Sequence, residues 1–252
     1  MESSRRDWFR RLAAGLAAGS VAKEAIAEQE NIQLPGILSV IECQSGLQQS
    51  PALEKRMNQL DGFLVYTNAE RDVRLYAPAE EVFRLTLMKS GSIISDRYRA
   101  FDYRHPIISQ IAKHETAGCS SKEGAAQRLL DFVHSYVSDA DMEAEDASKH
   151  PVVTLVRRYG DCEGLTALFG SLVKAAGIDF ALLYFSSHKY GEPSHVMGGV
   201  AGDFHGAYYL KNSRRYFPAE TTGTLFFERP EKRFIGRLPS QFDGKIPTVY
   251  VI

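Results

Sequence analysis

The sequence has no large excess of charge of either sign, and this absence limits the partners that we expect. It carries 30 basic and 31 acidic residues among 252, with an isoelectric point of about 6.7. Because nucleic-acid binding needs a basic patch or stripe, this balance does not favour a nucleic-acid partner. The apolar fraction of 44% and the charged fraction of 24% are those of a globular protein, so disordered and collagen-like chains are excluded. At this length we expect one domain with a smaller annex.

Cysteine is also scarce, and its spacing excludes a common class of metal site. The three cysteines are Cys43, Cys119 and Cys162, and no two of them form a C-x-x-C pair. We therefore expect no structural zinc site, no other metal and no cofactor. An odd number of cysteines leaves one thiol free. If the protein is exported, Cys43 and Cys119 are the candidates for a disulfide, and Cys162 is then the free thiol.

The sequence lacks the run of about 20 apolar residues that a membrane-spanning helix needs. Its first 27 residues instead resemble a twin-arginine export signal. Arg5 and Arg6 precede a weakly apolar segment rich in Ala and Gly, and Ala25-Ile26-Ala27 supplies a small-x-small cleavage site. We therefore expect export to the periplasm or the exterior, with no transmembrane helix in the mature chain. The alternative is a cytoplasmic protein that retains an amphipathic N-terminal helix.

Residues 28–104 show no motif that carries chemistry, and we expect a linker followed by a small N-terminal annex. Residues 28–51 are polar and rich in Gln and Ser. Short runs of β-branched and aromatic residues then alternate with turn residues. They predict strands at Phe63–Tyr66, Val73–Tyr76 and Val82–Leu85.

The pattern becomes clearer from residue 105, so we expect the main domain at residues 105–252. Ser120 to Glu123 reads as a capping box, and apolar residues at helical spacing follow it. A second helix is predicted to begin at Asp161 and to stop at Gly177, with an apolar stripe that must be buried. Strands are predicted at Phe180–Phe185, His195–Val200, Ala207–Leu210 and Tyr216–Glu220. This order favours an α+β domain in which a helix packs on an antiparallel sheet.

Cys162 occupies the position where a helix start favours negative charge. Asp161 is a good N-cap, which makes Cys162 the first helical residue. Free backbone N–H groups and the helix dipole stabilise a thiolate there, and the N–H of Cys162 is available to an oxyanion. Many cysteines are merely small buried hydrophobes. The capped helix start favours the alternative, a nucleophilic thiol.

His195 and Glu220 are the candidate partners of this thiol. His195 follows a polar loop and opens an apolar strand, where the backbone is rigid enough to aim an imidazole. Gly198 and Gly199 would let the cysteine helix or a substrate approach that strand closely. Glu220 ends a strand two further along an expected meander, so its carboxylate could orient the imidazole. The alternatives are an inert histidine and a surface glutamate.

These residues resemble the core of the transglutaminase-like superfamily over roughly residues 105–240. The resemblance rests on the runs His150–Val156, Tyr159–Gly164, Ser194–Val200, Tyr216–Gly223 and Phe234–Pro239. It implies a papain-like thiol fold with a Cys, His and acid in that order, which are Cys162, His195 and Glu220 here. The family's acid is usually Asp, and this sequence has Glu instead.

The resemblance implies acyl-transfer chemistry on the amide of a peptide or protein through a thioester on Cys162. Water as the acceptor would make the protein a peptidase or deamidase, and an amine would make it a transglutaminase. The alternative is a binding or assembly module that uses the same fold to hold a peptide without catalysis. The sequence gives no indication of the oligomeric state.

Overall fold

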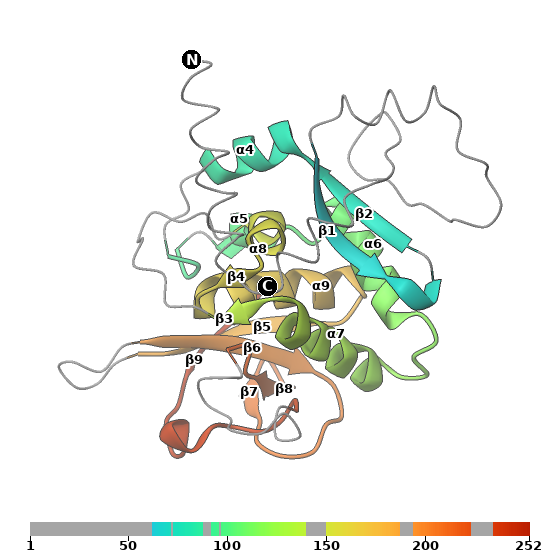
Figure 1. Ribbon diagram of the computed structural model, residues 1–252. Coiled ribbons are helices and arrows are strands. Elements are labelled where there is room, and N and C mark those ends of the chain that lie inside the picture. Colours follow the sequence, from blue (N-terminus) through green and yellow to red (C-terminus); the bar gives the residue numbers. More distant parts are fainter. Residues whose placement is uncertain are drawn as a thin grey trace, which may run out of the picture.

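The computed structural model describes residues 62–71, 73–87, 92–95, 97–139, 150–186, 194–222 and 234–252. Figure 1 shows the arrangement of the helices and strands. The expected export signal, the linker and Cys43 lie outside the described residues, so the expectations about them stay predictions. Within the described residues, no helix is both long and apolar enough to cross a membrane.

A five-stranded antiparallel sheet forms one side of the protein. Its order is β7-β8-β6-β5-β9. The strands are β5 (Phe180–Phe185), β6 (His195–Ala201), β7 (Tyr209–Lys211), β8 (Arg214–Ala219) and β9 (Thr248–Val251). The first four overlap the predicted strands, and the bounds of β5 are those predicted. The α+β class with an antiparallel sheet is therefore confirmed.

The strand order differs from the expected meander, because β8 and not β7 lies beside β6. Asn212 and Ser213 both have positive φ, at 51° and 61°, and join β7 to β8 in a two-residue hairpin. Such turns match the twist of paired strands. The hairpin places β7 at the outer edge of the sheet. The expectation that Glu220 lies two strands away from His195 was therefore wrong, since Glu220 directly follows β8 and His195 opens the neighbouring strand β6.

Four helices cover one face of this sheet (Figure 1). They are α6 (Pro106–Thr116), α7 (Lys122–Tyr136), α8 (Pro151–Arg157) and α9 (Cys162–Ala175). Helix α9 contacts β5 and β6 directly, and the other three pack around it. The cysteine helix therefore lies on the antiparallel sheet, as the sequence predicted.

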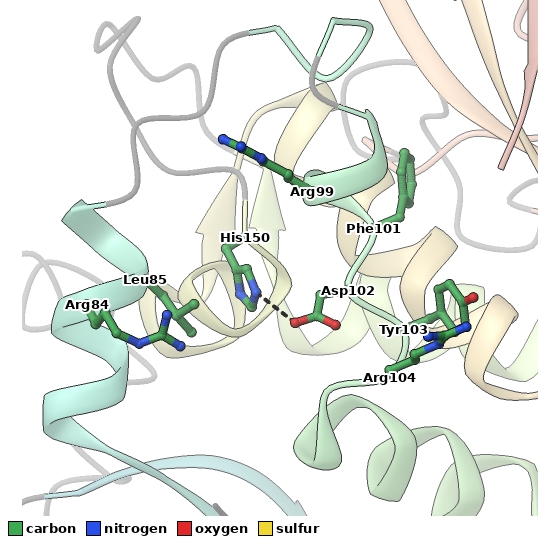
Figure 2. Close-up of a pocket in the computed structure, with 8 residues that line it drawn as sticks. All are labelled: Arg84, Leu85, Arg99, Phe101, Asp102, Tyr103, Arg104 and His150. Carbon is green, nitrogen blue, oxygen red and sulfur yellow. Dashed lines mark hydrogen bonds and ion pairs between the residues drawn. The ribbon is translucent and has the colours of Figure 1, made fainter.

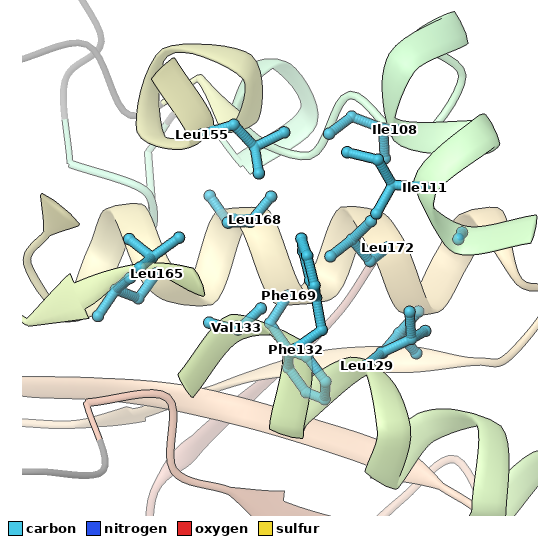
Figure 3. Packing of buried hydrophobic residues seen from close by; sticks show 14 of the residues in the cluster. Ile108, Ile111, Leu129, Phe132, Val133, Leu155, Leu165, Leu168, Phe169 and Leu172 are labelled. Atoms are coloured by element: carbon cyan, nitrogen blue, oxygen red, sulfur yellow. The ribbon is translucent and has the colours of Figure 1, made fainter. Parts of the chain in front are cut away.

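The largest hydrophobic cluster has α9 at its centre. Figure 3 shows buried side chains of α9 among those of α8, α6 and α7: Leu165, Leu168, Phe169, Leu172, Leu155, Ile108, Ile111, Leu129, Phe132 and Val133. Each such side chain stabilises the fold by roughly 1.5–3 kcal/mol when it leaves water. This packing fixes α9, and with it the residues at its N-terminus.

Gly198 permits the close approach of α9 and β6. A Cβ atom at this position would lie 2.9 Å from the ring of Phe180 and 3.0 Å from the ring of Phe169, which belongs to α9. Real Cβ atoms essentially never lie so close to another atom. The absence of a side chain therefore allows the cysteine helix to pack on the histidine strand, one of the two roles that the sequence suggested for Gly198.

The ends of the helices depart slightly from the predicted ones. The N-cap of α7 is Ser121, whose side chain accepts a hydrogen bond from Gly124 N at 3.0 Å, and not Ser120 as the capping box suggested. Glu123 instead accepts a bond from the backbone N–H of Asp203 at 3.1 Å. Two adjacent serines left the cap ambiguous by one residue. At the end of α9, Gly177 has a φ of +73°, as expected of a glycine that stops a helix.

The N-terminal part of the described chain contains a hairpin and a helix. Strands β1 (Gly62–Asn68) and β2 (Val73–Pro78) pair antiparallel, as predicted, around the short helix η1 (Ala69–Arg71). The third expected strand, Val82–Leu85, is wrong, because these residues belong to α4 (Ala79–Leu87). Three of these four residues are apolar, and so short a run does not distinguish a strand from one turn of a buried helix.

Helix α4 has its own helical signals. Ala79, Val82 and Leu85 are buried at a spacing of three, and two glutamates stand in its first turn, where the helix dipole favours acid. The hairpin and α4 both contact α8, and their buried residues join the same hydrophobic cluster as α9. The division of the chain at residue 104 stays a prediction.

Candidate active site

Cys162 is the first residue of α9, and Asp161 is its N-cap. The Asp161 side chain accepts a hydrogen bond from Gly164 N at 2.8 Å. The preceding strand β4 (Tyr159–Gly160) pairs with β3 (Ser138–Asp139), which holds the entry to the helix in place. Because the first N–H groups of a helix have no partner within it, the N–H of Cys162 is available to a bound group. The half-buried thiol therefore lies beside a donor that can stabilise an oxyanion.

His195 opens β6, and its ring contacts both other candidate residues. Its Nε2 donates to Oε2 of Glu220 at 2.8 Å, and the ring also shares a hydrogen bond with the Cys162 side chain. Since Glu220 occupies Nε2, Nδ1 is the nitrogen left for the sulfur. Phe242 of the short helix η3 (Ser240–Phe242) stacks on the ring with centroids 5.1 Å apart. Only 9% of His195 is exposed.

Glu220 follows β8 directly and is only 2% exposed. Ala219 pairs with Gly198, so the next residue comes close to the start of β6, where His195 lies. Oε1 of Glu220 accepts bonds from Thr222 N at 2.8 Å and from Thr222 Oγ1 at 2.6 Å, while Oε2 faces His195. Every oxygen of this buried carboxylate has a partner, which is what a charge in the interior requires.

The sequence did not indicate a fourth residue of the site, His134. Its Nε2 donates to the backbone carbonyl of Glu220 at 2.8 Å, from α7 on the other side of the acid. The two residues are 86 positions apart in the chain. The available signal was a histidine in the last turn of a predicted helix, and this position does not indicate that Glu220 is its partner.

The electrostatics of His195 follow from these contacts. Burial by itself would lower the pKa of the ring, but the hydrogen bonds to Cys162 and Glu220 outweigh it and raise the pKa to about 10. An imidazole with such a pKa carries a proton at neutral pH. The site therefore holds a protonated imidazole beside the sulfur of Cys162, and a neighbouring positive charge is one of the features that favour a nucleophilic cysteine.

Two other histidines have structural roles. His105 and His150 are the N-caps of α6 and α8, and each accepts a backbone N–H two residues later at 3.3 Å. Their Nε2 atoms donate to Glu81 at 3.2 Å and to Asp102 at 3.3 Å. These bonds give them partners that the sequence did not reveal.

The remaining described cysteine, Cys119, is half-buried before α7 and forms no disulfide with a residue that the structure describes. Its suggested partner Cys43 lies outside the described residues, so the disulfide stays a prediction. Within the described ranges, no group of three or more His, Cys, Asp or Glu side chains is placed to hold a metal ion.

Comparisons with solved structures found distant similarities. One is to a "putative cysteine protease" from Cytophaga hutchinsonii, at 11% identity over 88% of this chain and 78% of that one, with a TM-score of 0.40. Another is to a "putative protease" from Parabacteroides distasonis ATCC 8503, at 15% identity over 66% of this chain, with a TM-score of 0.36. This chain spans only 34% of the length of the second protein. The comparison with curated proteins found no match to this chain.

The family comparison is more direct. A family model described as the transglutaminase-like superfamily matches residues 109–207. This range contains Cys162, His195 and the packed helices α7, α8 and α9, while Glu220 lies beyond it. Residues 109–207 of this chain are thus similar to the core of the transglutaminase-like superfamily.

Proposed function

We propose that the protein is a thiol-dependent acyl-transfer enzyme in which Cys162 is the nucleophile, His195 transfers protons and Glu220 orients His195. The observation that carries the proposal is that one ring bonds both partners. His195 shares a hydrogen bond with the Cys162 side chain and bonds the buried carboxylate of Glu220 at 2.8 Å. A nucleophile, a base and a group that orients the base are the parts that covalent acyl transfer needs.

In the first half of the reaction, the Cys162 thiolate attacks the carbonyl carbon of an amide and forms a C–S bond. The carbonyl oxygen takes up the negative charge, and the backbone N–H of Cys162 supports it. The His195 imidazolium then gives its proton to the amide nitrogen as the C–N bond breaks. An amine leaves, and the acyl group remains on the sulfur as a thioester.

In the second half, an acceptor attacks the thioester and neutral His195 takes its proton. The C–S bond breaks, and the thiolate and imidazolium return. With water as the acceptor, the product is a carboxylic acid, which describes a peptidase or a deamidase. With an amine, the product is a new amide, which describes a transglutaminase. We propose a peptide or protein as the acyl donor, through a backbone or side-chain amide.

A small activated ester tests the chemistry without a known substrate. The full chain is mixed with p-nitrophenyl acetate, and the p-nitrophenolate released in the first turnover is measured with the mass of the acetylated protein. We expect a burst of one p-nitrophenolate per chain, with the acetyl group on Cys162. Cys162→Ala should abolish the burst. Cys119→Ala, which removes the other described cysteine, is the matched control and should keep it.

The same experiment separates the competing functions. Adding n-butylamine should yield N-butylacetamide if an amine can reach the thioester, and acetate alone if only water can. His195→Ala should slow acylation strongly, and full activity in that variant would mean that another group is the base. A wild-type protein that shows no burst would contradict the proposal and would favour a peptide-binding module.

We also propose that the protein is exported through a twin-arginine signal. The support is the Arg5-Arg6 pair, the weakly apolar segment after it and the small-x-small site at Ala25–Ala27. The full chain expressed in a bacterium with this pathway should appear in the periplasmic fraction, shortened at its N-terminus. Changing both arginines to lysine should retain it in the cytoplasm. Equal export of the double variant would show that the segment is not such a signal.

A further inference from the structure

A pocket lies beside the N-terminus of α8, where α4 approaches the segment between α5 (Arg97–Ala100) and α6. Its volume is about 510 Å³, within the range of roughly 300–1,000 Å³ that is usual for ligand sites. Figure 2 shows the side chains that line it. None of the three residues proposed for catalysis is among its lining residues.

The lining of this pocket has more positive than negative charge. Three arginines line it, Arg84, Arg99 and Arg104, against one carboxylate, Asp102. All three arginines are exposed. Among the residues that the structure describes, Arg99 and Arg104 form no ion pair, and the guanidinium of Arg104 instead lies over the ring of Tyr103 at 5.5 Å. Two exposed cations therefore line the pocket with no ion-pair partner among the described residues.

Asp102, the one carboxylate among the described lining residues, is held in a fixed position. Oδ2 of Asp102 accepts a hydrogen bond from His150 Nε2 at 3.3 Å, while Nδ1 of the same ring accepts the backbone N–H of Val152. The ring of His150 therefore joins the Asp102 carboxylate to the first turn of α8. The bond from His150 lowers the pKa of Asp102, so this group stays ionised at neutral pH and can accept an N–H from a ligand.

The positive groups do not converge on one point. Figure 2 shows Arg84, Arg99 and Arg104 in different parts of the pocket, with the bonded pair of His150 and Asp102 between them. A single compact anion such as phosphate could contact one of these cations but would lie near the Asp102 carboxylate. A ligand with separated negative groups and N–H donors between them matches the arrangement at every point. A short acidic peptide has this pattern, because its side-chain carboxylates alternate with backbone amides.

We propose that this pocket binds an acidic peptide segment, with carboxylates on Arg99 and Arg104 and a backbone N–H on Asp102. Guanidinium groups suit this role because their planar forks match carboxylates in two parallel hydrogen bonds. The proposal does not require that Cys162 is a nucleophile, since the pocket is a separate set of residues. The pocket would give the chain a site that recognises the negative charge of a peptide.

The test uses the full chain with Cys162→Ala as the background, so that no covalent reaction can contribute. Binding of a fluorescein-labelled Glu-Gly-Glu-Gly-Glu peptide is measured by fluorescence anisotropy and compared with that of the matched Gln-Gly-Gln-Gly-Gln peptide. We expect the acidic peptide to bind and the neutral one not to. Arg99→Gln and Arg104→Gln should each weaken binding by roughly fivefold, as expected for exposed ion pairs, and the double variant by roughly twentyfold. Added sodium chloride should weaken it further.

Arg128→Gln is the matched control, because Arg128 is another exposed arginine, on α7 and outside the pocket. It should change the Kd less than twofold. Equal binding of the acidic and neutral peptides, or binding that survives the double variant, would overturn the proposal. Competition by inorganic phosphate at concentrations as low as those of the unlabelled peptide would also overturn it, since the pocket would then hold a single compact anion. Failure of both peptides to bind would also overturn the proposal.

Discussion

The hydrogen bond between Glu220 and His195 allows us to predict how the pKa of His195 changes in the variant Glu220→Gln. Glutamine keeps the shape of the side chain but removes its charge. A hydrogen bond to a charged group contributes roughly 1.5–3 kcal/mol, and one unit of pKa corresponds to about 1.4 kcal/mol. Without the carboxylate, the charged form of the ring loses this stabilisation. The pKa of His195, which is about 10 in the intact site, should therefore fall by roughly one to two units.

The measurement is an NMR titration of protein labelled with nitrogen-15 in its histidines. The signal of His195 is assigned by its loss in His195→Ala. The burst with p-nitrophenyl acetate is measured in both proteins, and because p-nitrophenolate leaves without a proton, the burst reports the attack of the Cys162 sulfur. Removing the charged bond should also slow the burst, by on the order of 100-fold at most.

The control for this prediction is Thr222→Val, which keeps the size of the side chain. It removes the hydroxyl that donates to Oε1 of Glu220 and leaves the bond from Oε2 to His195 intact. The pKa of His195 should then change much less than in Glu220→Gln. If His195 titrated at the same pH in Glu220→Gln as in the wild type, the carboxylate would not be stabilising the charged ring, and the assigned role of Glu220 would be refuted.

Three further predictions concern the groups around this pair. Asp161→Ala should destabilise the protein by about 1 kcal/mol and slow the alkylation of Cys162 by iodoacetamide, whereas Ser121→Ala, which removes the cap of α7, should cost about as much stability and leave alkylation unchanged. His134→Ala should slow the burst by roughly fivefold, because the backbone carbonyl of Glu220 loses the hydrogen bond that holds it. His134→Gln keeps a donor and should restore the rate. Equal rates in the wild type and both variants would contradict a positioning role for His134. Because the pKa of His195 rises from its ordinary 6.5 to about 10 in the folded protein, its bonds stabilise the fold fully below about pH 6.5 and progressively less up to about pH 10. Urea unfolding should therefore show a difference between wild type and His195→Gln that is largest near pH 6 and shrinks toward pH 10, and a difference that grew with pH would refute this assignment.

The elements around the candidate nucleophile could be predicted because their signals are local. Asp161 caps α9, Gly177 ends it with a positive φ, and its apolar residues recur at helical spacing between them. The run Phe180–Phe185 is short, apolar and bounded by turns, and it forms β5 with the same bounds. These signals depend on residues close in the chain, so the sequence alone defined them.

The relations between distant elements could not be predicted in the same way. The pairing of β8 with β6 depends on where the turn at Asn212 and Ser213 directs the chain. The sequence of neither strand indicates which strand pairs with it. Strand β9 (Thr248–Val251) was missed, because four residues at an edge give too little pattern. The bond from His134 to the acid joins two elements 86 residues apart, and no spacing rule connects them.

The order of strands has a consequence for how the proposed site would respond to change. His195 opens β6 and Glu220 directly follows β8, and backbone hydrogen bonds join these two strands within one sheet. Cys162 belongs to a helix that rests on that sheet through Phe169 and the space left at Gly198. A larger residue in this interface would shift the sulfur relative to the imidazole while the bond between imidazole and carboxylate stayed intact. Reactivity is thus adjustable from the buried layer between helix and sheet, far from any surface that a substrate touches.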